Sequence, residues 1–247
     1  MALRVELRKQ GDFLFKNRSY LPLIIIVFGL GVYIYNEYNH EVLMNRQVEV
    51  YHLICLVVCL LGFFIRVHAV GFSAKNTSGR NTVVGQVADT VNKTGMYSIC
   101  RHPLYIGNFF MWLGIAGFTQ EPWFIFAFIF IYWMYYERIM YAEEEFLIDK
   151  YGDEYVNWAK NTPAIFPKFS QWKKSEHAFN WTKVIRQEKA GLLNLFLVTF
   201  VFMLIESYMQ FGEPFKMDLY WIIAFAASIL WYIVIKTIQK TTNLLVD

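Results

Sequence analysis

The sequence is poor in charge for its length. Only 17% of its 247 residues are Asp, Glu, Lys or Arg, whereas 56% are hydrophobic and 19% are aromatic. A soluble domain carries about 25% charged residues, so this shortage argues against a soluble globular protein. The apolar residues form continuous runs and not the alternating pattern of an outer-membrane barrel. Because backbone in lipid must satisfy its own hydrogen bonds, these runs predict helices.

Other common signals are missing too. The chain has three cysteines, and Cys55 and Cys59 lie one helical turn apart, which suits apolar packing better than a disulfide. No metal-ligand spacing, Walker loop or Gly-x-Gly-x-x-Gly fingerprint is present. No small-x-small cleavage site follows the first apolar run, which predicts a retained helix. We therefore expect no resident metal and no nucleic-acid partner.

The apolar runs predict an all-α, polytopic transmembrane protein with about six spans. A span requires about 20 residues, so the third is short. Residues 119–122 connect it to the fourth, which predicts a tight helical hairpin with Pro122 in the first turn of the fourth helix. The six predicted spans lie near Tyr20–Tyr38, Val50–Val67, Pro103–Phe118, Trp123–Tyr141, Gly191–Tyr208 and Leu219–Ile235.

Basic residues predict the topology of these spans. Of 23 Lys and Arg residues, all except Arg46 and Lys216 lie in the N-terminus, the second-to-third and fourth-to-fifth connections and the C-terminus, counting those at the adjoining span ends. Cytoplasmic loops carry such an excess, so both termini should be cytoplasmic. The composition fits a bacterial inner membrane or the endoplasmic reticulum equally.

Three regions follow from this layout. We expect two helices and a cytosolic connection in residues 1–94, a core with the hairpin and a cytosolic cofactor pocket in residues 95–167, and a basic, aromatic connection with two further helices in residues 168–247. The long segments His68–Cys100 and Glu143–Lys189 lie on one membrane face. Function should therefore lie at that face.

Two polar motifs flank the hairpin. Residues 95–107 read Gly-Met-Tyr-Ser-Ile-Cys-Arg-His-Pro-Leu-Tyr-Ile-Gly, and residues 143–147 read Glu-Glu-Glu-Phe-Leu before Tyr151-Gly152 and Tyr155. Taken singly, each could be an interfacial anchor or a solvated helix end. Three carboxylates at a helix C-terminus oppose the helix dipole, so propensity does not explain them. Opposite an Arg-His-Pro element, they indicate a small zwitterionic ligand between the two motifs.

The paired motifs resemble the isoprenylcysteine carboxyl methyltransferase family, with which the phospholipid methyltransferases share much of this pattern. The resemblance covers about residues 95–167 and implies a cytosol-facing pocket for S-adenosylmethionine. Arg or His suits the cofactor's carboxylate, Glu its ammonium, and Tyr faces its sulfonium and adenine. The residues implied to line the cofactor are Tyr97, His102, Pro103, Leu104, Tyr105 and Glu143.

The family also implies a substrate-binding arginine one turn before the glutamates. Ile139 stands at that place, and Arg138 is its nearest basic neighbour, beside Glu137. One position rotates a helical residue by about 100°, so Arg138 should point in another direction. We expect Arg101 or Arg138 to hold an anionic acceptor. If the acceptor is an amine, Glu137, Glu144 or Glu145 should accept its proton.

The predicted function is methyl transfer from S-adenosylmethionine to a membrane-embedded amphiphile. A phosphate or carboxylate oxygen of an anionic lipid is favoured by the basic connection Lys168–Lys189. A prenylcysteine carboxylate and a phosphatidylethanolamine amine stay open, as does the oligomeric state.

Two alternatives belong to other classes of protein. An NADPH-dependent lipid or sterol reductase shares the Arg-His-Pro element, but it would need an arginine cluster for the extra phosphate. A transporter usually carries charges at midplane, whereas Arg66 and Glu206 lie near predicted span ends.

Overall fold

The computed structural model describes residues 2–18, 20–40, 46–77, 88–242 and 244–245, and over these residues the fold is all-α, as predicted, with no strand. Residues 78–87 of the expected cytosolic connection fall outside this description. The helices are α1 (Leu3–Lys16), α2 (Tyr20–His40), α3 (Arg46–Gly71), η1 (Met96–Ser98), α4 (Pro103–Gly117), α5 (Pro122–Tyr151), α6 (Asp153–Ala159), η2 (Phe169–Gln171), α7 (Trp181–Phe211) and α8 (Leu219–Thr241).

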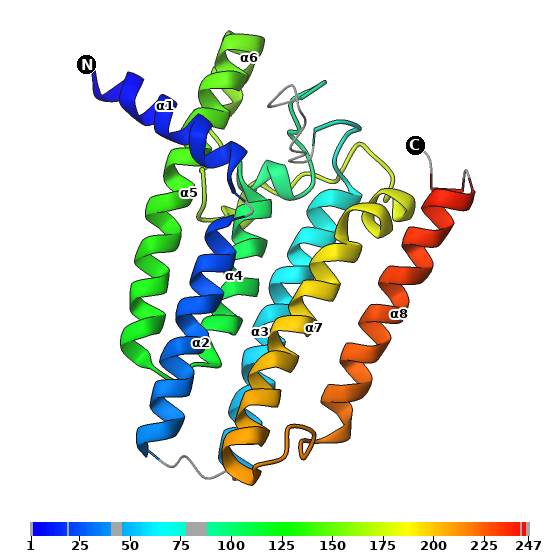
Figure 1. Cartoon of the computed structure of the whole chain (residues 1–247). Helices are drawn as coiled ribbons and strands as arrows, with labels where there is room; N and C mark the ends of the chain where they lie inside the picture. The colour runs from blue at the N-terminus through cyan, green and yellow to red at the C-terminus, as the bar shows by residue number, and fades with distance from the viewer. Residues whose placement is uncertain (1, 19, 41–45, 78–87, 243, 246–247) are drawn as a thin grey trace.

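The longer helices, α2, α3, α4, α5, α7 and α8, run roughly side by side (Figure 1). The shorter α1 and α6 lie at one end of this bundle, and the C-terminal end of α8 lies at that end too. The turns that join α4 to α5 and α7 to α8 lie at the opposite end. Both 3-10 helices belong to the connections near α1 and α6, so most non-helical chain gathers at one end of the molecule.

Each predicted span lies almost entirely within one of the long helices. Three helical segments are long and apolar enough to cross a membrane: Gln47–Gly71, Trp181–Phe211 and Leu219–Thr241. These make the protein a polytopic membrane protein. Helix α4 has only 15 residues, and the segment Leu23–Asn39 of α2 is apolar but shorter than these three. Tyrosine, tryptophan and the charged residues Glu137 and Arg138 lower the hydropathy of α5. The crossing of the membrane by α2, α4 and α5 stays a prediction.

The hairpin of α4 and α5 begins at proline on both arms. Pro103 and Pro122 each lie in the first turn of their helix, where the missing N–H costs no hydrogen bond. Helix α5 then continues well past the predicted end of the span at Tyr141, as far as Tyr151. Gly152, with a φ of 54°, ends α5 and precedes α6. The glutamate motif thus lies within a continuous helix beyond its apolar part.

The sequence did not predict α1, a 14-residue helix that packs along α5. Its Gly11 allows close approach, because a Cβ there would lie 2.2 Å from the carbonyl oxygen of Arg138. Arg4 adds an ion pair, with its Nη2 2.7 Å from a carboxylate oxygen of Glu145. Helix α1 therefore covers one outer face of α5.

Helices α3 and α4 approach each other through glycine. A Cβ on Gly62 would lie 2.4 Å from both the carbonyl oxygen of Gly107 and the amide nitrogen of Met111. Small residues at such positions let two membrane helices pack backbone against backbone. This contact fixes the position of α4, and so of the motif at its N-terminus, against α3.

Gly62→Ala should lower the thermal unfolding midpoint in detergent, because its Cβ meets backbone atoms that cannot move independently. Overpacking of this kind costs about 1–3 kcal/mol. The matched control is Gly31→Ala on α2, where no heavy atom lies within 4 Å of the added Cβ. Equal midpoints for the two variants would contradict the close α3–α4 packing.

Candidate functional site

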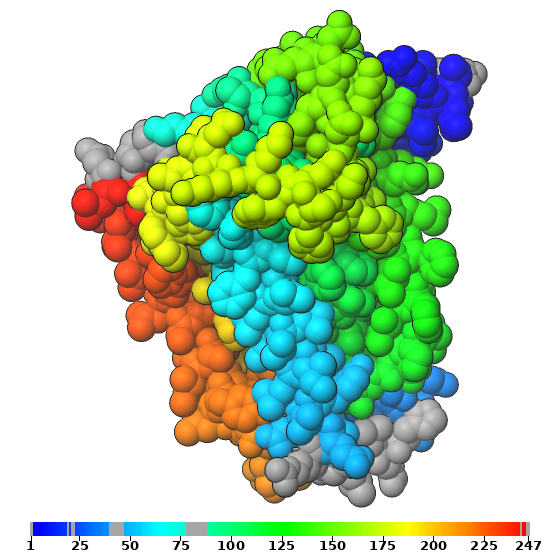
Figure 2. Space-filling view, turned by 180° about the vertical axis from the view of Figure 1, so that it is seen from behind, coloured from blue at the N-terminus to red at the C-terminus, as the bar shows by residue number. Residues whose placement is uncertain are grey.

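The first motif is held in place by the chain that follows α6. The backbone N–H of Arg101 donates to the carbonyl oxygen of Pro163 at 2.9 Å, and that of His102 donates to Ala164 at 3.1 Å. The segment from α6 to α7 also lies across the end of α3 (Figure 2). The Arg-His-Pro element is therefore clamped just before α4 begins.

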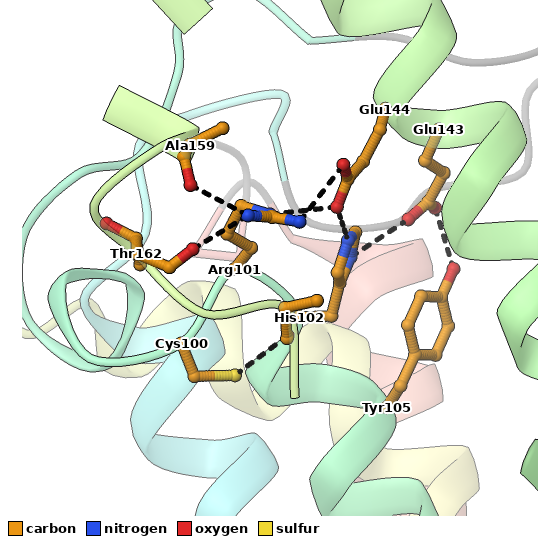
Figure 3. A network of polar contacts seen from close by, with 9 residues as sticks. Cys100, Arg101, His102, Tyr105, Glu143, Glu144, Ala159 and Thr162 are labelled. Carbon is orange, nitrogen blue, oxygen red and sulfur yellow. Dashed lines mark hydrogen bonds and ion pairs between the residues drawn. The ribbon is translucent and has the colours of Figure 1, made fainter. Parts of the chain in front are cut away.

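Arg101 ties three helices together (Figure 3). Its Nε and Nη2 donate to the two carboxylate oxygens of Glu144 at 2.8 and 3.2 Å, and its Nη1 donates to the carbonyl oxygens of Ala159 and Thr162 at 2.8 and 2.7 Å. One N–H on Nε, two on Nη1 and one on Nη2 are thus engaged, four of the five that arginine has. Arg101 acts mainly as a structural link between the start of α4, α5 and the end of α6.

The three successive glutamates contact three different partners, because consecutive residues point about 100° apart on a helix. Glu143 accepts a 2.7 Å hydrogen bond from the hydroxyl of Tyr105 on α4. Glu144 lies 2.8 Å from Nε2 of His102 as well as against Arg101. Glu145 faces Arg4 of α1. This division explains why an acidic run is stable at this end of α5.

The environments of Glu143 and Glu144 move their pKa values in opposite directions. Burial raises the pKa of Glu143, although His102 and the Tyr105 hydroxyl act against this. Burial would also raise the pKa of Glu144, but the hydrogen bond from His102 and the charges of His102 and Arg101 outweigh it and lower that pKa. Neighbouring carboxyls with diverging pKa values mark a candidate functional site.

A cavity of about 590 Å³ opens beside this network. That volume is within the range of sites for small molecules and cofactors. Its wall comes from the ends of α1, α3 and α7, the connection before α4, and the facing ends of α4, α5 and α6. All six residues predicted to line the cofactor border it, and so does Arg101: they are Tyr97, Arg101, His102, Pro103, Leu104, Tyr105 and Glu143.

Glu137 and Arg138 do not border this cavity. Arg138 donates to the side chain of Gln10 on α1 at 3.0 Å and to the carbonyl oxygen of Met134 at 2.7 Å, and Glu137 is exposed. The cavity-facing side of α5 passes through Tyr136 and Glu143. Arg138, two positions beyond Tyr136, therefore points to the side that α1 covers, and Ile139 is fully buried.

Other residues of the wall were missed from the sequence. Arg66 of α3 was taken for a residue at a span end, yet it borders the cavity together with Asn108 of α4 and Glu188 of α7. An arginine inside an apolar helix was the signal that could have found this group, because such charges are expensive in a membrane. Glu188 gave no signal, since it lies among the charges of the basic connection.

No group of three or more His, Cys, Asp or Glu side chains is placed to hold a metal ion within the part of the chain that the structure describes. The side chains around the cavity instead suit an organic ligand with charges of both signs. A carboxylate, a helix N-terminus and several aromatic rings border the same space.

The phospholipid methyltransferase family matches residues 50–154, from α3 through the hairpin into α6. This segment is therefore similar to that family. The match confirms the resemblance inferred from the two motifs, and it adds α3 to the region of similarity. The part of α7 that borders the cavity lies beyond it.

Individual curated proteins are also similar to part of this chain. The protein-S-isoprenylcysteine O-methyltransferase of Saccharomyces cerevisiae is 30% identical over 46% of this chain and 47% of its own length. The enzyme of the same name from Schizosaccharomyces pombe is 30% identical over 51% and 53%. A cobalt-zinc-cadmium resistance protein of Cupriavidus metallidurans is 30% identical over 37% and 42%. The matched part thus spans about half the length of these relatives, and no solved structure gave a significant match.

Arg101→Met should destabilise the protein by about 1.5–3 kcal/mol, because it leaves Glu144 and two carbonyl oxygens without their charged donor. Thermal unfolding in detergent measures this loss. Arg8→Met is the matched control, since its pair with Asp149 is largely exposed and should contribute less than about 1 kcal/mol. An Arg101 variant no less stable than the Arg8 variant would contradict the linking role.

Proposed function

We propose that this protein transfers a methyl group from S-adenosylmethionine to an anionic headgroup of a membrane-embedded lipid or lipidated molecule. The observation that supports it most strongly is the convergence of the two family motifs on one cavity, with Glu143 bound to Tyr105 at its edge. The relatives named isoprenylcysteine methyltransferases add support.

The residues around the cavity fit this cofactor. The Glu143 carboxylate keeps 20% of its side-chain surface exposed and can pair with the cofactor's ammonium. The N-terminal end of α4, where Leu104 borders the cavity, carries the positive end of the helix dipole, which can attract the cofactor's carboxylate. Tyr97 and Trp158 offer aromatic faces for the sulfonium and the adenine. When bound there, the cofactor would supply an electrophilic methyl group.

The protein's own part in this reaction is positioning. His102 is fixed between Glu144, at 2.8 Å, and the more distant Glu143, at 3.6 Å from its Nδ1. This keeps the imidazole and the two carboxylates in one arrangement before any ligand arrives. Because methyl transfer is an in-line displacement, such alignment of donor and acceptor supplies most of the catalysis. An anionic oxygen requires no general base, which agrees with the exposed position of Glu137.

The charge of the cavity wall favours an anionic acceptor. Positive side chains outnumber carboxylates around the cavity, and a surplus of one sign attracts ligands of the other. The basic residues gather at the end of the bundle that holds the cavity, so we propose that this end, with both termini, faces the cytoplasm. The charged residues that border the cavity are Arg18, Arg66, Arg101, Arg186, Lys189, Glu143 and Glu188.

The function is tested by incubating purified protein in lipid vesicles with methyl-labelled S-adenosylmethionine, followed by phase separation and mass analysis. We expect label in the lipid phase. Glu143→Gln should weaken cofactor binding at least tenfold, because a neutral amide cannot pair with the ammonium. Glu145→Gln, the matched control on the face toward α1, should stay within twofold. Absence of both label and cofactor binding in the wild type would contradict the function.

The pH dependence of cofactor binding gives a further prediction. Glu143 holds a cation only when ionised, and burial raises its pKa. Affinity should therefore fall on acidification at a higher pH than an ordinary glutamate would produce. Equilibrium binding measured across the acidic range checks this, with Glu143→Gln expected to be weak and nearly independent of pH. A wild type whose affinity declines only in the range of an unperturbed glutamate would contradict the role of Glu143.

A further inference from the structure

One side of the cavity is not used by the cofactor residues. It is formed by Arg66 of α3, Asn108 of α4 and Glu188 of α7, all of which border the same space as His102 and Glu143. Asn108 lies one turn beyond Tyr105 on α4 and therefore deeper in the bundle. This group is placed between the cofactor motifs and the apolar part of the molecule, where the headgroup of a lipid would lie.

Arg66 donates hydrogen bonds through all three nitrogens of its guanidinium. Its Nε and Nη2 donate to the two carboxylate oxygens of Glu188 at 2.9 and 2.6 Å, and its Nη1 donates to Oδ1 of Asn108 at 2.6 Å. These bonds use three of the five N–H groups of an arginine. Among the residues that the structure describes, the other N–H on each terminal nitrogen has no hydrogen-bond partner, so both can donate to an anionic oxygen.

The two partners of this ion pair differ in how far they are exposed. The Arg66 side chain keeps 21% of its surface exposed, whereas Glu188 keeps 3%. The guanidinium therefore presents surface to the cavity, while the carboxylate that orients it is largely covered. Removing one partner of a buried pair costs about 3–5 kcal/mol, so Glu188 holds Arg66 in this orientation and is not easily displaced.

The stem of Arg66 is fixed as well. A Cβ on Gly107 would lie 2.6 Å from Cγ of Arg66, so the last residue of the first motif is glycine where the arginine side chain passes. The motif that forms the cofactor side of the cavity thus also makes room for Arg66. A guanidinium restrained at both its stem and its head loses little entropy when it binds a ligand.

We propose that Arg66 binds the anionic group of the methyl acceptor, with Glu188 and Asn108 as positioning residues. This inference rests on the proposed function and names its acceptor-binding side. An acceptor oxygen held there would form a new O–C bond with the methyl carbon as the C–S bond breaks, and that electron pair goes to sulfur. The oxygen's negative charge and the sulfonium's positive charge cancel, so no proton has to leave.

The test uses two variants of the full chain in vesicles. Arg66→Met with Glu188→Met removes the whole buried pair, a change that often leaves stability unaltered. Arg66→Lys keeps the charge and a partner for Glu188 but loses the two-pronged geometry. The probes are phosphatidylglycerol vesicles, phosphatidylethanolamine vesicles and N-acetyl-S-farnesylcysteine, which separate a phosphate, an amine and a carboxylate acceptor. Lys216→Met, at the opposite end of the bundle, is the control.

We expect the double variant to bind S-adenosylmethionine within threefold of wild type, with kcat/KM for the anionic acceptor at least 100-fold lower. Arg66→Lys should lower this kcat/KM about tenfold, mainly by raising KM.

An unchanged acceptor KM in both variants would mean that the pair only links helices, and it would overturn the inference. Loss of cofactor binding in Arg66→Lys would overturn it too, by placing Arg66 on the cofactor side. Activity confined to phosphatidylethanolamine would contradict an anionic acceptor, and a wild type that neither binds cofactor nor labels any probe would contradict the proposed function itself.

Discussion

The structure of the site depends on one set of charged hydrogen bonds, those between Arg101 and His102 before α4 and Glu144 on α5. Charged partners at 2.8 Å form strong hydrogen bonds in surroundings shielded from water. They join the N-terminal end of α4 to the C-terminal part of α5, the two ends of the hairpin that lie away from its turn. Without them, the start of α4 and the glutamate end of α5 would lose the link that keeps Glu143 opposite Tyr105.

The two sides of the cavity have different origins. Apart from Trp158, the residues proposed to hold the cofactor lie within residues 50–154, the segment similar to the phospholipid methyltransferases. The deeper side of the cavity takes Glu188 from α7, outside that segment, and Arg66 from α3, inside it. The added helices thus complete a charged wall around a shared core. This arrangement fits a protein that keeps one methyl donor while its acceptor varies, because donor and acceptor contact different helices.

The helices followed from apolar runs because lipid leaves the backbone no other partner, and six long helices appear at the six predicted spans. The six residues predicted to line the cofactor all border the cavity, because the hairpin brings its two flanking motifs together. Helix α1 was missed because its apolar residues are too few for a span signal, although Gly11 packs tightly on α5. The direction of Arg138 could not be predicted without knowing which face of α5 is covered by α1. The Arg66–Glu188 pair joins residues 122 positions apart, so no local sequence pattern could predict it.

The central claim is that both family motifs face one cofactor. Photo-crosslinking of the purified protein in lipid with a photoactivatable S-adenosylmethionine analogue, followed by peptide mass mapping, tests it most directly. The account predicts crosslinks in residues 95–105 and 143–158 that excess S-adenosylmethionine abolishes. Crosslinks that excess cofactor does not reduce, or that fall on the outward faces of α2 and α8, would contradict it.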